Sequence, residues 1–339
     1  MKITVKNKFK AILSVAKAHL LKKSTPLSVV LTTNTRCNYS CKYCKIWTKN
    51  EELTTAQIKN LIDELAVMGT YRLSFTGGEP LLRDDIGYLI DYAKSKGFYL
   101  TLNSNGSLVE KKIDDIRNLD RLILSFDGEE SIHNFHKMDG AYAGVIKAIK
   151  IAKSHGINVW TTTTITKHNL YSIDFILKKA SDMKFNPIFQ ILHHSESIAG
   201  NTDHLLASKD DYKKVLTKLI EYKKTYKNIM VNSSKYLEIL LNWMDYSKPI
   251  SEKTIHASLK TKCWAGKLYC HIDATGKVYP CQQLIGSLDA PNFLSMGFNK
   301  AFHSIPKTNC KICMAGDYLE NNLLFSLDIN SIKNILNKI

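Results

Sequence analysis

The chain of 339 residues contains no apolar run that approaches the roughly 18–20 residues of a membrane span. Its first residues, Met1 to Lys6, lack the apolar core of a signal peptide, so we expect a cytoplasmic protein. No tract is of low complexity, and no basic segment is interleaved with aromatic residues as in single-strand-binding platforms. No clear nucleic-acid partner is therefore indicated.

Acidic residues are missing from the first fifty positions, and the chain as a whole carries a net charge of +16. This excess favours an anionic partner, such as an acidic small molecule, a lipid surface or a peptide, although a solvated lysine-rich surface needs no partner. Residues 7–23 are predicted to form a basic amphipathic helix. We expect its apolar face to pack on the main domain, and the alternative is peripheral contact with the inner membrane surface. The predicted apolar stripe consists of Phe9, Ile12, Leu13, Ala16 and Leu20.

Cysteine is absent from positions 45–262, so the eight cysteines fall into two groups. In a reducing compartment such groups indicate metal ligands rather than disulfides. Cys37, Cys41 and Cys44 have the spacing C-x3-C-x2-C, whereas a structural zinc site needs four ligands. Three thiolates around a four-iron cluster leave one iron free to bind a small chelating molecule. Zinc with an unseen fourth ligand is the alternative.

Strand-like and helix-like segments alternate from residue 28 to about 193. Such alternation predicts a parallel sheet with right-handed crossovers, and six repeats predict an incomplete barrel with its active site at the C-terminal strand ends. The predicted strands are 29–34, 72–76, 98–103, 121–126, 158–165 and 187–193. The predicted helices are 55–68, 84–95, 110–118, 143–154, 171–183, 209–226, 236–243 and 329–339.

The run Cys37-Asn38-Tyr39-Ser40-Cys41-Lys42-Tyr43-Cys44 follows the first strand and has an aromatic residue before its third cysteine. It resembles the motif of the radical S-adenosylmethionine (radical SAM) enzymes. The resemblance implies an α/β fold with a partial (β/α)6 TIM-type barrel, a 4Fe-4S cluster on Cys37, Cys41 and Cys44, and bound SAM. It also implies reductive cleavage of SAM to a 5′-deoxyadenosyl radical that modifies an unactivated carbon. A reductant such as flavodoxin or ferredoxin would supply the electron.

The second strand runs into Thr76-Gly77-Gly78-Glu79-Pro80. Glycines permit close backbone approach to a ligand, and a glutamate can take a charged amine. The run resembles the GGEP motif, which binds the methionyl amino group of SAM. Polar residues at later strand ends suit further SAM contacts, although Asn-Gly and Asp-Gly also favour ordinary turns. The predicted SAM-binding residues are Tyr43, Gly77, Gly78, Glu79, Pro80, Asn103, Ser125 and Asp127.

The second cysteine group resembles the twitch domain, a shortened SPASM extension that carries one auxiliary 4Fe-4S cluster. We assign its ligands as Cys263, Cys281, Cys310 and Cys313, with structural zinc as the alternative. Cys270 is left over. It is a weak catalytic candidate as a hydrogen-atom donor, it could replace Cys263 as a ligand, and a plain buried cysteine is the commoner outcome.

These observations divide the chain into five parts. They are a basic N-terminal helix (1–26), a radical SAM barrel core (27–194), a helical bridge (195–262), a twitch or SPASM-like auxiliary-cluster domain (263–318) and a C-terminal helix (319–339). The predicted function is a radical SAM enzyme whose auxiliary cluster takes part in electron transfer. The alternatives are a SPASM-type maturase of a ribosomal peptide and a non-catalytic zinc or iron–sulfur binding protein.

Overall fold

A computed structural model describes residues 13, 15–20, 24–46, 50–193, 202–248, 250–251 and 261–336. Within them the chain forms an eight-stranded sheet in the order β6-β5-β4-β3-β2-β1-β8-β9. Strands β1 to β6 and β8 are parallel, and β9 pairs antiparallel with β8. The strands are β1 (Ser28–Thr32), β2 (Arg72–Thr76), β3 (Tyr99–Ser104), β4 (Arg121–Ser125), β5 (Val159–Ile165), β6 (Asn186–Ile191), β8 (Tyr269–Ile272) and β9 (Val278–Tyr279). The predicted α/β partial barrel is confirmed.

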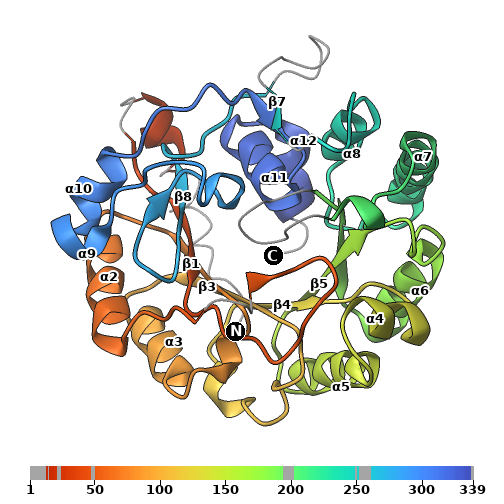
Figure 1. Cartoon of the computed structure of the whole chain (residues 1–339), viewed down its shortest axis with the longest axis horizontal. Helices are drawn as coiled ribbons and strands as arrows, with labels where there is room; N and C mark the ends of the chain where they lie inside the picture. Colours follow the sequence, from red (N-terminus) through yellow and green to blue (C-terminus); the bar gives the residue numbers. More distant parts are fainter. Residues whose placement is uncertain are drawn as a thin grey trace.

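Figure 1 shows α2 to α8 as an outer ring around the strands, whereas residues of α11 line the lumen. Helices of the ring connect β1 to β2, β2 to β3, β4 to β5 and β5 to β6, and turns with a short 3-10 segment connect β3 to β4. The helices are α2 (Thr55–Val67), α3 (Ile86–Ser95), α4 (Glu130–His136), α5 (Ala141–Ser154), α6 (Ile173–Met183), α7 (Lys209–Thr225), α8 (Ser234–Leu241), α9 (Phe293–Met296), α10 (Phe298–His303), α11 (Gly316–Phe325) and α12 (Ile329–Leu336).

Alternating side chains explain how the strands face both the helices and a central lumen. Outward positions such as Val29, Leu73 and Leu122 are fully buried against the helices in the main apolar core. The lumen positions of the same strands are largely polar, for example Ser74 and Ser125. Because side chains alternate with a period of two, each strand supplies a core and a polar lumen at once. A polar lumen of this kind suits a ligand better than a packed barrel interior.

Two predicted elements differ from the structure. Residues 110–118 form turns and a short 3-10 segment, Asp114–Ile116, rather than a helix. The helix α4 between β4 and α5 was not predicted, because its seven residues are too few to show helical periodicity. The predicted boundary between barrel and C-terminal region is crossed by the sheet, since β8 pairs with β1 along Ser28–Leu31. The five-part division therefore stays a prediction.

The N-terminal helix contacts the C-terminal region through its described residues, Leu13 and 15–20. Val15 and Ala18 pack in a small apolar cluster with Trp264, and the His19 Nε2 atom lies 2.5 Å from the carbonyl oxygen of Phe325. Two residues of the predicted stripe point instead to solvent: Leu20 is 81% exposed and Leu13 is 42% exposed. Phe9 and Ile12 lie outside the described residues.

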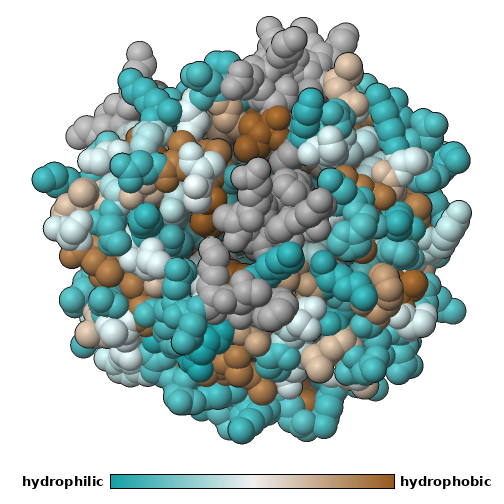
Figure 2. Space-filling model, in the orientation of Figure 1, coloured by the Kyte–Doolittle hydropathy of each residue, from teal (hydrophilic) through white to brown (hydrophobic). Residues whose placement is uncertain are grey.

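The surface facing the viewer in Figure 2 is mostly hydrophilic, with small, separated hydrophobic patches. None of the described helices combines the length and the apolar character needed to cross a membrane.

Candidate active site at the cysteine loop and the barrel lumen

The loop that carries the first cysteine group leaves the C-terminal end of β1 and lies against the turn after β2. Backbone hydrogen bonds join Gly78 N to Asn34 O (2.9 Å) and Glu79 N to Arg36 O (2.8 Å). A Cβ atom on Gly77 would lie 2.3 Å from Asn34 O, and one on Gly78 would lie 2.1 Å from Arg36 O. The close approach that these glycines permit is therefore to the cysteine loop itself.

Arg83 fixes both ends of this loop, a role that the sequence analysis missed. Its Nη1 atom donates to Thr33 O (3.2 Å), before the cysteines, and to Leu53 O (2.7 Å), after them. The same guanidinium lies 2.8 Å from Glu52 and 2.7 Å from Asp85. Because the side chain is only 3% exposed, these bonds form away from solvent and hold the loop firmly.

Glu79 is fully buried beside the loop. Its carboxylate accepts hydrogen bonds from Asn105 N (2.8 Å), Leu81 N (3.1 Å) and Ser104 Oγ (3.0 Å). Burial nevertheless raises the pKa of Glu79 to about 7 against these donors. The ion pairs among the described residues do not include Glu79. A ligand ammonium would supply the missing positive charge.

Asp127 anchors Tyr43, the aromatic residue between the second and third cysteines. Tyr43 OH donates to Asp127 Oδ2 (2.5 Å), Lys137 Nζ lies 3.4 Å from the same oxygen, and Lys137 also donates to Tyr43 OH. Thr164 N donates to Asp127 Oδ1 (3.1 Å). Burial would raise the pKa of Asp127, but the neighbouring cation Lys137 and the histidines of α4 outweigh it and lower the pKa. The Asp127 carboxylate is therefore bound by groups of the protein itself, namely Tyr43, Lys137 and the backbone amide of Thr164.

A cavity of about 290 Å³ occupies the lumen beside these groups. Cys44, Tyr43 and Lys137 line one end. The predicted SAM contacts Asn103 and Ser125 line its wall, whereas the residues 77–80 do not. Lys137 is the cation at the end of the cavity nearest the cysteine loop. The sequence analysis missed it, because it is a single lysine at the C-terminal cap of α4, a short helix that was not predicted.

The three thiols of the loop are partly buried and close enough to influence one another. Burial raises the pKa of Cys37 to about 11, with further contributions from Glu79, Cys41 and Cys44. Asn105 Nδ2 lies 3.9 Å from Cys37 Sγ and 2.9 Å from Asn38 Oδ1. Thiols in such surroundings release their protons only to a strong positive charge, and iron supplies it. The three residues therefore fit a cluster.

The four predicted auxiliary ligands gather around Tyr269. Burial is the main cause of the strongly raised pKa of Tyr269, and Cys263, Cys313 and Cys281 add to it. Cys263 also interacts with Cys310: a hydrogen bond from Cys310 lowers the pKa of the Cys263 thiol. Tyr269 stacks on Tyr318, with ring centroids 5.5 Å apart, and on Phe325. Cys281 and Cys313 are buried in this aromatic cluster, and Cys263 and Cys310 are half-buried. The site fits a group held by all four thiolates.

Cys270 lies elsewhere. It occupies β8 in register with Val29 of β1, and it is fully buried in the main apolar core. It lies neither in the wall of the cavity nor in the cluster that contains Cys281 and Cys313. Of the three interpretations of Cys270, namely a hydrogen-atom donor, a metal ligand and a plain buried cysteine, these surroundings match the last.

The cavity connects the two cysteine groups. Its far end is lined by Gln282 and Gln283, which follow Cys281, and by residues 315–318, which follow Cys313. Tyr318 OH accepts a hydrogen bond from Gln282 N (3.0 Å) and lies 3.2 Å from His271 Nδ1. His271 Nε2 in turn lies 2.8 Å from Thr32 Oγ1 at the end of β1. A molecule in the lumen would therefore lie between both groups.

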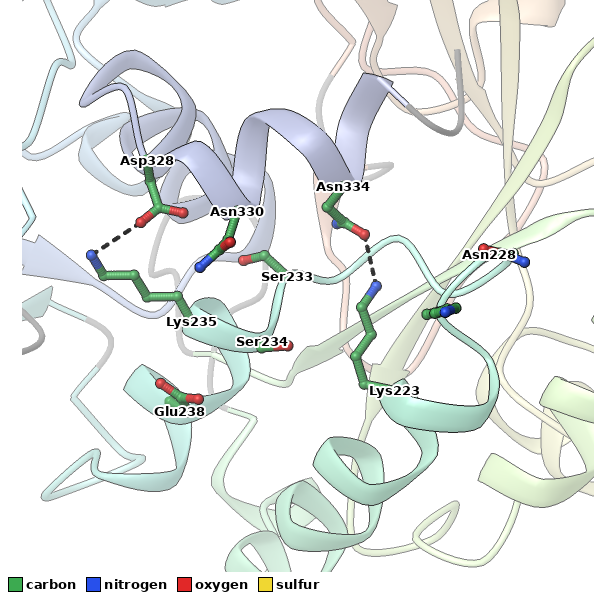
Figure 3. A pocket seen from close by; sticks show the side chains of 10 residues that line it. Lys223, Asn228, Ser233, Ser234, Lys235, Glu238, Asp328, Asn330 and Asn334 are labelled. Atoms are coloured by element: carbon green, nitrogen blue, oxygen red, sulfur yellow. Dashed lines mark hydrogen bonds and ion pairs between the residues drawn. The ribbon is translucent and has the colours of Figure 1, made fainter.

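A larger surface pocket of about 670 Å³ lies between α7, α8 and α12 (Figure 3). Four of its polar side chains are paired with one another: Lys235 lies 3.3 Å from Asp328, and Lys223 donates to Asn334 Oδ1 (2.8 Å). No cysteine lines it. The lumen cavity, which Cys44 lines, is therefore the candidate active site.

Among the described residues, no three histidine, cysteine, aspartate or glutamate side chains converge on a position for one metal ion. A four-iron cluster is several ångströms across, so its thiolates need not point at a single atom. The ligand assignments of both groups accordingly stay predictions supported by pattern and neighbourhood.

Comparison with known proteins agrees with this geometry. Residues 31–179 match the family described as the radical SAM superfamily. An AdoMet-dependent heme synthase of Methanosarcina barkeri is 29% identical over 262 residues, covering 73% of this chain and 74% of the relative. A PqqA peptide cyclase of Gluconobacter oxydans is 25% identical over 301 residues, covering 84% of this chain and 79% of the relative.

Among solved structures, Streptococcus suis SuiB bound to S-adenosylmethionine has a TM-score of 0.69 at 15% identity, covering 90% of this chain and 73% of that one. The likeness shows a shared fold. The match of residues 31–179 is to a superfamily whose cofactors are a 4Fe-4S cluster and SAM.

Proposed function

We propose that this enzyme cleaves SAM at a cluster held by Cys37, Cys41 and Cys44 and oxidises or rearranges a substrate bound in the lumen. The observation that carries the proposal is one polar cavity whose two ends are formed by neighbours of the two cysteine groups. When bound, the cluster and SAM supply a radical that removes hydrogen from an unactivated carbon. The chain supplies placement and exclusion of water.

The residues near the loop have distinct roles in this proposal. Glu79 accepts the ammonium of SAM, because it is buried and hydrogen-bonded and forms no ion pair with a described residue. Lys137 offers a positive charge to the SAM carboxylate from the cavity wall, while Asp127 holds both Lys137 and Tyr43 in position. Asn103 and Ser125 offer hydrogen bonds to the rest of the molecule.

The second cysteine group, Cys263, Cys281, Cys310 and Cys313, holds an auxiliary 4Fe-4S cluster in this proposal. Its enclosure by Tyr269, Tyr318 and Phe325 suits electron transfer rather than ligand binding. In this proposal a substrate in the cavity lies between the cysteine loop, where the radical forms, and the second cysteine group, which accepts an electron.

The test is anaerobic reconstitution followed by SAM and a strong reductant. The expected result is iron bound at both groups and formation of 5′-deoxyadenosine. Zinc at both groups, or no 5′-deoxyadenosine from iron-loaded protein, would instead support a non-catalytic metal-binding protein.

A peptide substrate is the second candidate. It is favoured by the 25% identity to a PqqA peptide cyclase over 84% of this chain. The fold likeness extends to a structure of SuiB bound to its precursor peptide. Incubation of the reconstituted enzyme with candidate peptides and with small acids, followed by mass spectrometry of each, separates the two substrate classes.

A further inference from the structure

Arginine is rare in this chain, and two arginines lie at the N-terminal ends of lumen strands. We call this end of the lumen, opposite the cysteine loop, its floor. Only five of the 47 basic residues are arginines. Arg72 begins β2 and lines the cavity. Arg121 begins β4 and lies on the same face as Ile123 and Ser125, which also line it, because side chains two apart share a face of a strand.

Neither arginine has a carboxylate partner among the described residues. The ion pairs there include Arg36 and Arg83 but neither arginine of the floor. The Nε atom of Arg72 and the Nε and Nη2 atoms of Arg121 are buried without hydrogen-bond partners, and Arg121 is only 7% exposed. Asp120, its neighbour in sequence, is engaged by Lys94 at 2.6 Å.

Aromatic rings hold Arg121 in place. Its Cζ atom lies 3.2 Å from the centroid of Trp160 and 5.5 Å from that of Tyr99. Burial lowers the pKa of Arg121 to about 10, and the like charge of Arg72 adds to this effect. Ring faces attract a cation but do not neutralise it, so the floor keeps an excess of positive charge.

Arg72 is the member of the pair that can reach a ligand. Arg72 makes a long hydrogen bond within the protein, 3.5 Å from its Nη2 atom to Thr101 Oγ1. Thr101 is also the register partner of Arg121, so it separates the two charged groups on the lumen face. A planar guanidinium that borders a cavity and lacks a carboxylate is suited to bidentate binding of an oxyanion.

We propose that Arg72 binds a carboxylate of the substrate, and that Arg121, held against Trp160, adds positive potential behind it. This inference rests on the proposed function and names its substrate class, an organic acid. Strand β2 rises about 13 Å from Arg72 to Thr76 at the cavity's other end. The acid group would therefore lie deep in the lumen while the reacting carbon lies near the cysteine loop.

The experiment uses the full chain with its reconstituted metal sites under anaerobic conditions. Thermal unfolding is followed during titration with glutarate, with the uncharged diamide glutaramide, and with inorganic phosphate, at constant ionic strength. We expect glutarate to raise the unfolding midpoint with millimolar half-saturation and glutaramide to have no effect. Arg72→Gln should weaken the glutarate response at least tenfold, and Arg72→Lys should weaken it less.

Arg117→Gln is the matched control, because Arg117 is exposed and carries the same charge. It should respond to glutarate as the unmodified chain does. Equal responses of the unmodified chain and Arg72→Gln, or equal responses to diamide and diacid, would overturn the proposal. A stronger response to phosphate than to glutarate would overturn it as well, in favour of an inorganic-anion site.

If Arg72 had a purely structural role, Arg72→Gln would lower the unfolding midpoint measured without added anion. Under the proposal, removing one of two like charges leaves that midpoint unchanged or higher. A large fall would therefore overturn the proposal. Cleavage of SAM by the unmodified chain is measured on the same preparation. Its absence would reject the proposed function, whereas the glutarate response tests the floor site independently.

Discussion

The two cysteine groups occupy opposite kinds of surroundings. The first group lies on a loop whose neighbours are polar or charged: Asn105 near Cys37, and Lys137 at the cavity wall beside Cys44. In the second group, Cys281 and Cys313 lie in an aromatic cluster with Tyr269 and Tyr318, whereas Cys263 and Cys310 are half-buried. A site with three thiolates that borders a polar cavity can bind and activate a ligand. A site with four thiolates and apolar walls is suited to passing electrons.

The largest expected effect follows from Cys41→Ala, which removes one of three thiolates at the open site. We expect cleavage of SAM to fall on the order of a thousandfold or more, because the cofactor carries the difficult step. The measurement is 5′-deoxyadenosine formation with excess reductant. The iron bound at the first cysteine group should be lost, while the second group should retain its iron. Retention of cleavage at the unmodified rate would contradict the assignment of the first group.

Cys281→Ala tests the enclosed site. We expect iron content to fall by about four per chain, while cleavage of SAM without substrate stays within about threefold of the unmodified rate. Iron analysis and the electron paramagnetic resonance spectrum of the reduced protein measure both properties. If cleavage falls as far as in Cys41→Ala, the two groups are not separate in function.

Lys137→Gln tests the charged network around Tyr43. Asp127 would keep its buried negative charge without the ammonium, which costs about 3–5 kcal/mol when one partner of a buried pair is removed. The free energy of unfolding from urea titration measures this loss. The double variant Lys137→Gln with Asp127→Asn is the control and should recover most of it. No loss in the single variant would show that the pair does not stabilise the site.

We expect Glu79 to make the binding of SAM depend on pH. Its pKa is raised from 4.5 to about 7 in the folded state, mainly by burial. The folded protein without ligand therefore holds a proton that the unfolded chain releases, and up to about 3 kcal/mol of stability present below pH 4.5 is lost as the pH rises through 7.

Binding of the SAM ammonium needs the ionised carboxylate, so the affinity for SAM should rise about tenfold from pH 6 to pH 8. Equilibrium dialysis with labelled SAM measures it. The matched variant Glu79→Gln should bind weakly with little dependence on pH. A pH dependence that survives this substitution would point to another titrating group.

The smallest effect is expected for Cys270→Val. The side chain lies in the apolar core, and a volume-conserving apolar change there costs less than about 1.5 kcal/mol. Iron content and SAM cleavage should be unchanged. A loss of iron comparable to that of Cys281→Ala would make Cys270 a ligand and would revise the composition of the enclosed site.

Local patterns predicted the parts of the site that depend on neighbours in sequence. The strand before Cys37 and the strand before Gly77 were predicted because apolar runs bounded by turns are visible locally. The roles of Arg83, Lys137 and Arg72 were not predicted. Each is a single basic residue with at least one partner far away in the sequence: Leu53 lies 30 positions from Arg83, Tyr43 lies 94 positions from Lys137, and Thr101 lies 29 positions from Arg72.

The amino-acid sequence alone determined the class of the fold, the two cysteine groups and the placement of polar residues at strand ends, because spacing and periodicity are local properties of the chain. Only the tertiary structure decided that β8 extends the sheet beside β1 and that one cavity joins the two cysteine groups. The physical reason is that the pairing of strands more than 200 residues apart depends on which sheet edge remains free. That edge exists only after the barrel has formed.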